Sequence, residues 1–190
     1  MINKQLRQMM MIAVFGALAL LLTLLEVHIP PFAPFLKYDA GDIPAMVATY
    51  AMGPAVGLGV QGLKAVLFLL SGRSEAGWVG VLANFLAGGA LVLGAGLMQQ
   101  VLDRTGARSW GWSILSAVVG TLVMTAVLIP VNALLVYPLW GMKGAAAWSG
   151  ALSISTPFNL FKGFVSCTIS VPFYYRLQPF MARVVRREAA

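Results

Sequence analysis

The chain has 190 residues, of which 59% are hydrophobic and only 10% are charged, and its mean hydropathy is +0.84. This composition excludes an ordinary water-soluble domain and predicts an integral membrane protein. A crossing helix needs about 20 apolar residues, so the length allows about six crossings and little else. We therefore expect an all-α membrane protein, a bundle of six transmembrane helices in a single domain over residues 1–190, surrounded by membrane lipid.

The net charge of +7 is unevenly placed, which argues against a nucleic-acid partner. Eight basic residues fall on one side of the expected helices, and three fall on the other. The eight are Lys4, Arg7, Arg104, Arg108, Arg176, Arg183, Arg186 and Arg187, and the three are Lys37, Arg73 and Lys143. Because positive residues concentrate in cytoplasmic loops, both termini are expected in the cytoplasm of a multi-pass cell-membrane protein.

The first helix is expected over residues 5–27. Ala13 and Ala17 lie four positions apart, so they share one face and allow another helix to approach closely. That neighbour is either a helix of the same bundle or an external partner, and the spacing alone fits both. The apolar run is too long for a cleaved signal peptide and is followed by further apolar segments.

A Pro-rich turn over residues 29–34 leads into the most unusual stretch of the chain. Lys37, Tyr38, Asp39 and Asp42 crowd together there, just before Pro44. Either aspartate can cap the next helix, and Pro44 fits its first turn. The stretch is therefore either an ordinary capped helix start or an outer loop that folds over a ligand pocket.

The remaining helices follow at short intervals. They are expected over residues 41–52, 55–70, 78–102, 112–137 and 155–176, with polar connections over residues 71–77 and 103–109 and an outer connection over residues 140–148. The second of the six is short for a full crossing. Cys167, the single cysteine, has no internal disulfide partner and is expected to pack as a small apolar residue.

Two lysines, Lys64 and Lys162, lie inside apolar segments, where a central Lys costs roughly 2.5–3.5 kcal/mol. Asn159 and Lys162 are three apart and project from one helical face, which offers an amide and a cation to a flat heteroaromatic ligand. The alternatives are that Lys162 snorkels to an interface and that Asn159 bonds a neighbouring helix. Asn84 and Asn132 are further buried polar groups, each explicable alone as interhelical bonding. Together these residues predict an outward-opening pocket beneath the loop from Lys37 to Asp42.

Several motifs are absent. The chain has no GxxxxGK[ST] phosphate loop, and His28 is its only histidine, so neither ATP binding nor a metal site is expected. No carboxylate is expected inside the spans, which disfavours proton coupling. No catalytic residues are assigned, so an intramembrane enzyme is the least favoured class and a binding subunit energised from outside is favoured.

Five segments resemble the riboflavin-specific substrate-binding components of energy-coupling factor (ECF) transporters. They are residues 36–44, Gly53-Pro54, the helix that contains Lys64, Ala83-Asn84-Phe85 and residues 156–163, and the likeness covers nearly the whole chain. The resemblance implies a vitamin-binding subunit that joins a transmembrane scaffold and two cytoplasmic ATPases. It also implies that Ala13 and Ala17 face the scaffold, that Asn159 and Lys162 meet the isoalloxazine ring, and that Asn132 is a second ring contact.

The full set of expected substrate-binding residues is Lys37, Tyr38, Asp39, Asp42, Lys64, Asn84, Asn132, Asn159 and Lys162. No cofactor is expected, and riboflavin is the expected transported ligand. The rival interpretations are a carrier of the same architecture for thiamine, biotin or FMN, and a structural membrane protein without a ligand.

Overall fold

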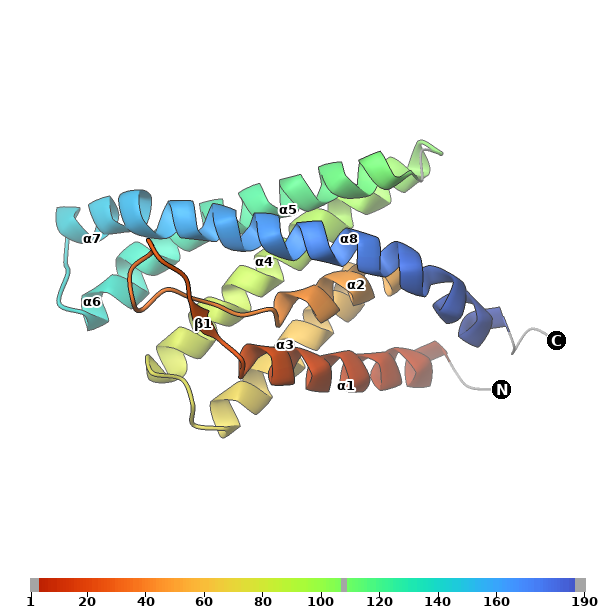
Figure 1. The fold of residues 1–190 in the computed structure, drawn as a ribbon, viewed down its shortest axis with the longest axis horizontal. Helices are drawn as coiled ribbons and strands as arrows, with labels where there is room; N and C mark the ends of the chain where they lie inside the picture. The colour runs from red at the N-terminus through yellow and green to blue at the C-terminus, as the bar shows by residue number, and fades with distance from the viewer. Residues whose placement is uncertain (1–3, 107–108, 187–190) are drawn as a thin grey trace.

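In a computed structural model, which describes residues 4–106 and 109–186, the chain is an elongated bundle of helices with one short β-ribbon (Figure 1). The α-helices are α1 (Lys4–Thr23), α2 (Asp42–Met52), α3 (Pro54–Leu70), α4 (Gly77–Arg104), α5 (Trp110–Val131), α6 (Tyr137–Leu139), α7 (Ala145–Gly150) and α8 (Thr156–Arg186). Two π-helical turns, η1 (Asn132–Val136) and η2 (Ala151–Ser155), join α5 to α6 and α7 to α8. The described residues thus form six helical rods, as predicted.

The predicted helix ends are close except at three places, one of which is the end of the last helix, at Arg186 rather than near residue 176. The first helix stops at Thr23 rather than near residue 27, because the chain turns there into strand β1 (Val27–His28), which pairs antiparallel with β2 (Lys37–Tyr38). The last rod begins at Ala145, ten residues before the predicted start, since η2 continues the helix instead of breaking it. The outer connection is correspondingly shorter than expected.

Three helical stretches are long and apolar enough to cross a membrane: Gln5–Thr23, Gly77–Arg104 and Trp110–Leu139. The 11 residues of α2 span only about 16 Å at 1.5 Å per residue, which is about half of the hydrocarbon core. This short helix lies inside the bundle, in contact with α1, α3, α4 and α8, and eight of its residues are buried. Gly53 ends it with a φ of +97°, which favours glycine, and Pro54 then starts α3.

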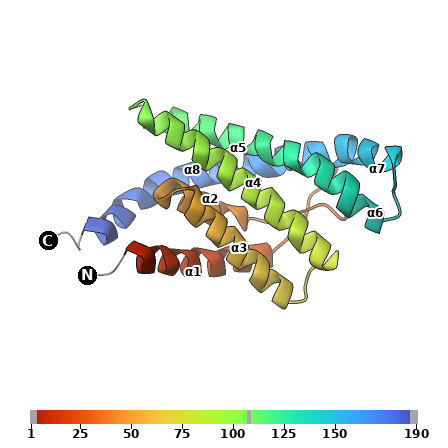
Figure 2. The same ribbon diagram turned by 180° about the vertical axis from the view of Figure 1, so that it is seen from behind.

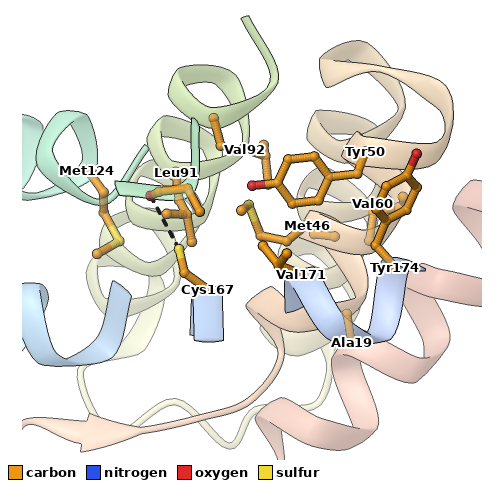
Figure 3. Close-up of a cluster of buried hydrophobic side chains, with 14 of the residues drawn as sticks. Ala19, Met46, Tyr50, Val60, Leu91, Val92, Met124, Cys167, Val171 and Tyr174 are labelled. Atoms are coloured by element: carbon orange, nitrogen blue, oxygen red, sulfur yellow. Dashed lines mark hydrogen bonds between the residues drawn. The ribbon is translucent and has the colours of Figure 1, made fainter. Parts of the chain in front are cut away.

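The interior of the bundle is packed with medium-sized apolar side chains (Figure 3). Met46 of α2, Leu91 of α4 and Met124 of α5 are fully buried, and Cys167 of α8 is buried beside them as predicted. The outward faces are also apolar: Val14 of α1, for example, is 66% exposed. Large exposed apolar surfaces on several helices are typical of a lipid-facing bundle, which confirms the predicted class of all-α membrane protein.

The two ends of the bundle differ. Both termini and the turn between α4 and α5 lie at one end, whereas the α1–α2 connection, the α3–α4 turn and the α6–α7 turn lie at the other (Figures 1 and 2). The predicted basic cluster belongs to the end with the termini, although Arg108 and Arg187 lie outside the described residues. The unusual residues of the α1–α2 connection therefore sit at the opposite end, where the site described next is found.

Candidate functional site

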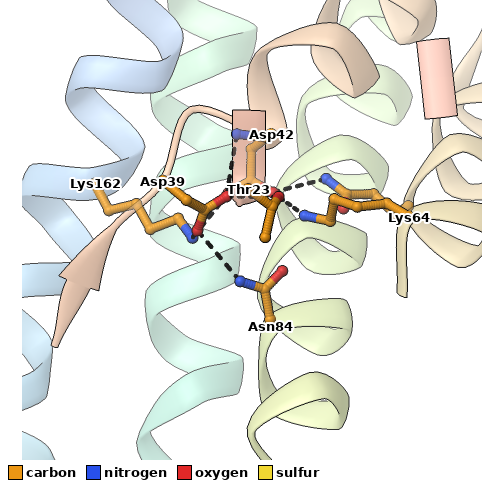
Figure 4. Close-up of polar contacts among 8 residues, drawn as sticks. Thr23, Asp39, Asp42, Lys64, Asn84 and Lys162 are labelled. Carbon is orange, nitrogen blue, oxygen red and sulfur yellow. Dashed lines mark hydrogen bonds and ion pairs between the residues drawn. The ribbon is translucent and has the colours of Figure 1, made fainter. Parts of the chain in front are cut away.

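Two carboxylates from the α1–α2 region meet a lysine of α8 inside the bundle (Figure 4). The Nζ atom of Lys162 lies 2.7 Å from Oδ2 of Asp39 and 3.2 Å from Oδ2 of Asp42. All three side chains are almost completely buried. Lys162 therefore does not snorkel to an interface, which was one of the two alternatives left open by its position in the sequence.

The second intramembrane lysine belongs to the same cluster. Nζ of Lys64 lies 2.9 Å from Oδ1 of Asp42, and the amide of Gln61 donates a hydrogen bond of 2.9 Å to that oxygen. Asp42 is the first residue of α2, at a segment end as expected for the acidic residues, yet it has no exposed surface. Two buried ammonium groups face two buried carboxylates, and this balance offsets the desolvation of the four charges.

The α1–α2 connection enters the bundle at Gly41, where its backbone packs closely against the end of α1. A Cβ atom at this position would lie 2.0 Å from Oγ1 of Thr23 and 2.9 Å from Oδ1 of Asp39, closer than real Cβ contacts come. The missing side chain leaves room for Thr23 and the Gly41 N–H to donate hydrogen bonds to Oδ1 of Asp39, at 3.1 and 3.0 Å. The amide of Asn84 donates to its other oxygen at 3.3 Å. Asp39 is thus tied to α1, α4 and α8 at once.

A cavity of about 160 Å³ opens beside this cluster. Much of its wall is apolar, with Phe158 among it, and its polar residues are Lys37, Asn84, Asn132, Asn159 and Lys162. Asn159 is only 5% exposed, and its amide nitrogen has no hydrogen-bond partner among the described residues. Because a buried donor without a partner is costly, this nitrogen marks a position where a bound acceptor would be favoured.

A second cavity of about 150 Å³ adjoins the first and leads outward. Phe35, Lys37 and Asn84 line both cavities, while Glu26 and Glu75 line only the outer one. Lys37 forms ion pairs with both glutamates, and its hydrogen bonds to Glu75 and Glu26 raise the pKa of the lysine above its usual value. The outer cavity is therefore a charged vestibule to a less charged inner chamber.

Aromatic side chains of the α1–α2 connection cover the site. The ring of Phe32 lies 5.3 Å from those of Phe158 and Phe161 on α8, between centroids. The ring of Phe35 stacks on Trp140 at 5.8 Å and meets Tyr137 edge-on. The loop from Lys37 to Asp42 was predicted to form the cover. In the structure Phe35, Leu36 and Lys37 line the inner cavity, whereas Asp39 and Asp42 turn inward to meet the lysines.

The predicted site residues are only partly brought together. Lys37, Asn84, Asn132, Asn159 and Lys162 line the inner cavity, and Asp39 lines the outer one. Tyr38, Asp42 and Lys64 are not among the residues that line either cavity. Tyr38 packs edge-on against Phe161, and the other two stand behind Lys162 in the charge cluster.

Several site residues were missed in the sequence. Thr23, Glu26 and Glu75 carry no spacing pattern that links them to the site, and Gln61 was noticeable only as a polar residue three positions before Lys64. Each of them acts through a contact between distant segments. Within the described part of the chain, no three His, Cys, Asp or Glu residues are grouped as metal ligands.

The alanines of the predicted partner surface lie on the outside of α1. Ala13 and Ala17 are exposed, whereas Gly16 and Ala19 of the same helix are buried. A Cβ at Gly16 would lie 2.7 Å from Leu63 of α3, so the inner face of α1 is the one that uses close approach within the bundle. The two alanines are free of that packing.

Comparison with known proteins gives a consistent picture. A family model described as the substrate-specific component of ECF transporters matches residues 7–174. The riboflavin transporter RibU of Staphylococcus aureus (strain TCH60) is 32% identical over 95% of both chains, and the riboflavin transporter FmnP of Bacillus subtilis (strain 168) is 28% identical over 92% of this chain and 94% of its own.

Solved structures show the same architecture. The S component of a bacterial ECF transporter superposes with a TM-score of 0.78 at 33% identity, covering 94% of this chain and 99% of its own. ThiT from Listeria monocytogenes superposes with a TM-score of 0.72 at 17% identity over the same shares, which indicates a common fold alone.

Proposed function

This chain belongs to the substrate-specific components of ECF transporters, and we propose that it is the riboflavin-binding subunit of such an importer. It binds the vitamin on the outer side of the membrane and releases it inside when coupled to its partners. It is a transport subunit and not an enzyme, as its relatives named riboflavin transporters indicate. The whole chain acts as one substrate-binding domain.

The observation that carries this proposal is the unpartnered amide of Asn159 beside Lys162 and Asn132 in an aromatic-walled cavity. An isoalloxazine ring is flat and apolar on its faces, with carbonyl oxygens, ring nitrogens and one N–H along its edge. Amide groups both donate and accept hydrogen bonds, and an ammonium group donates. A few such groups in an apolar chamber are what orients a flat heterocycle.

The size of the cavities indicates how the ligand lies. Pockets for drug-sized ligands have volumes of about 300–1,000 Å³, and the inner cavity, at about 160 Å³, holds only part of such a molecule. We place the ring in the inner chamber and the ribityl chain toward the outer one, past Lys37 and Asn84, which line both. Entry then requires displacement of Phe35, which also lines both cavities.

The partners follow from the family. We propose a transmembrane scaffold subunit and two cytoplasmic ATPases, with membrane lipid around the apolar faces and both termini in the cytoplasm. The exposed Ala13 and Ala17 on α1 support a scaffold contact, because small residues let a second helix approach closely. A separate energy source agrees with the absence of a phosphate-loop motif in this sequence.

The first test is the absorbance spectrum of the purified protein, since bound flavin is yellow, followed by equilibrium dialysis against riboflavin. We expect one riboflavin per chain. Competition with thiamine and biotin distinguishes other carriers of this architecture, and a structural protein would show no ligand-dependent thermal shift. Absence of riboflavin binding by the folded protein would refute the proposal.

A further inference from the structure

The outer cavity holds more negative than positive charge. Nζ of Lys37 lies 3.1 Å from Oε1 of Glu26 and 2.5 Å from Oε1 of Glu75. The three residues come from three segments: Glu26 follows α1, Lys37 is in β2, and Glu75 is in the α3–α4 turn. The side chain of Lys37 is 25% exposed, that of Glu26 34% and that of Glu75 66%, so the three charges lie at the boundary between cavity and solvent.

Lys37 is the only cation among the residues that line this cavity, and Glu26, Asp39 and Glu75 are its anions. Asp39 is balanced by Lys162 from the inner chamber. Lys37 is therefore shared between two carboxylates, and among the residues that line this cavity one negative charge is in excess. Arg73, itself exposed, lines an adjoining cavity together with Lys37 and the same two glutamates.

We propose that Glu26 and Glu75 determine specificity, so that the site accepts riboflavin and disfavours the flavin that carries a 5′-phosphate (FMN). The inference rests on the proposed function and deepens it by separating two flavins. The sequence left FMN among the rival ligands, and Lys37 is a cation of the outer cavity that a phosphate could pair with. In the structure that cation is already engaged.

The physical argument depends on where the phosphate arrives. In the placement proposed above, with the ring beside Asn132, Asn159 and Lys162, the far end of the ribityl chain lies toward the outer cavity. A phosphate monoester carries a charge of about −1.5 to −2 at pH 7. To enter, the phosphate group must approach the two glutamates or displace them from Lys37. Repulsion between these like charges weakens the binding of FMN. Riboflavin ends in a neutral hydroxyl and meets no such repulsion.

The test compares the dissociation constants of riboflavin and FMN for the full-length protein purified in detergent. We expect FMN to bind about tenfold more weakly than riboflavin, a difference of about 1.4 kcal/mol. Glu75→Gln and Glu26→Gln should each narrow the ratio of the two constants about two- to fivefold, in line with partly exposed charge interactions, and the double variant should narrow it further. Raising the salt concentration to about 1 M should also narrow the ratio, because exposed charges are then screened.

Asp103→Asn is the matched control, because it removes one negative charge at the opposite end of α4, where Asp103 is exposed. It should leave the ratio unchanged. Equal affinity for both flavins, or a ratio that is unaffected in the double variant, would overturn this inference while leaving riboflavin binding intact. A Lys37→Gln variant that weakens FMN more than riboflavin would also overturn it, since Lys37 would then be a phosphate ligand. Failure of the wild type to bind riboflavin at all would instead refute the proposed function.

Discussion

Lys162 and Asp39 lie 123 positions apart in the chain, and their charged atoms lie 2.7 Å apart in the structure. This ion pair joins a wall of the inner cavity to the connection between α1 and α2. The same carboxylate accepts a hydrogen bond from Thr23 at the end of α1, the helix that carries Ala13 and Ala17. The ligand chamber and the proposed scaffold-facing helix are thus linked through one side chain.

Asp42 should be essential for the stability of the bundle. Among the described residues, Asp42→Asn removes the carboxylate paired with Lys64 and one of the two paired with Lys162, and breaking a buried ion pair by removing one partner costs about 3–5 kcal/mol. We expect a strongly lowered thermal midpoint in detergent, measured by fluorescence or circular dichroism. Asp103→Asn, at an exposed position, should change the thermal midpoint little. A variant that combines Asp42→Asn with Lys64→Gln should recover part of the loss, and an unchanged midpoint for Asp42→Asn alone would contradict this account of the cluster.

Asn159 should affect binding without affecting stability. Its amide nitrogen has no partner among the described residues, so Asn159→Ala removes no hydrogen bond made by that donor within the protein. We expect riboflavin affinity to fall about tenfold, the value of one or two polar contacts, with the thermal midpoint nearly unchanged. Ser153→Ala, an exposed change in the same helical rod, is the control. Undiminished affinity would remove Asn159 from the site.

Lys162 should behave differently from Asn159. Both side chains line the inner cavity, so loss of either should weaken binding. Because Lys162 neutralises Asp39 and Asp42, we now expect Lys162→Ala to lower both riboflavin affinity and the thermal midpoint. Equilibrium dialysis and thermal melts on the same preparation separate the two effects. A variant that binds weakly but melts like the wild type would show that the ion pairs contribute little to stability.

Phe35 should control how fast the ligand leaves. Its ring packs against Tyr137 and Trp140 across the entrance, and it lines both cavities. We expect Phe35→Ala to accelerate riboflavin dissociation severalfold, because the half-buried Phe35 contributes only part of the about 1.5–3 kcal/mol that full burial of a Phe side chain gives. Stopped-flow flavin fluorescence measures this rate. Phe173→Ala, an exposed aromatic change near the other end of α8, should leave the rate as it is.

The outer face of α1 should decide assembly and leave ligand binding untouched. Replacing both Ala13 and Ala17 with Leu adds bulk to an exposed face whose small side chains allow another helix to approach closely. We expect loss of co-purification with the scaffold and ATPase subunits, with riboflavin affinity unchanged. Ala126→Leu, at an exposed position on α5, is the matched control. Normal assembly of the double variant would exclude this face as the scaffold contact.

The sequence by itself determined the class of protein and the approximate positions of its helices. Apolar runs, glycine–proline breaks and the uneven distribution of basic residues are local properties, so they can be read along the chain. Asn84, Asn132, Asn159 and Lys162 stood out for the same reason, because each is a polar residue in an apolar segment.

Only the tertiary structure decided what those residues do. In the sequence, Asp39 and Asp42 look like residues of a loop. They are buried in the bundle because Gly41 lets the chain pack closely against α1 and because Lys64 of α3 and Lys162 of α8 form ion pairs with them. The division of roles followed from this: Asn159 lines the chamber with a free donor, whereas Lys64 supports the cluster from behind. Ion pairs between segments 22 and 123 positions apart leave no periodic trace in a sequence, since they depend on how the helices pack against one another.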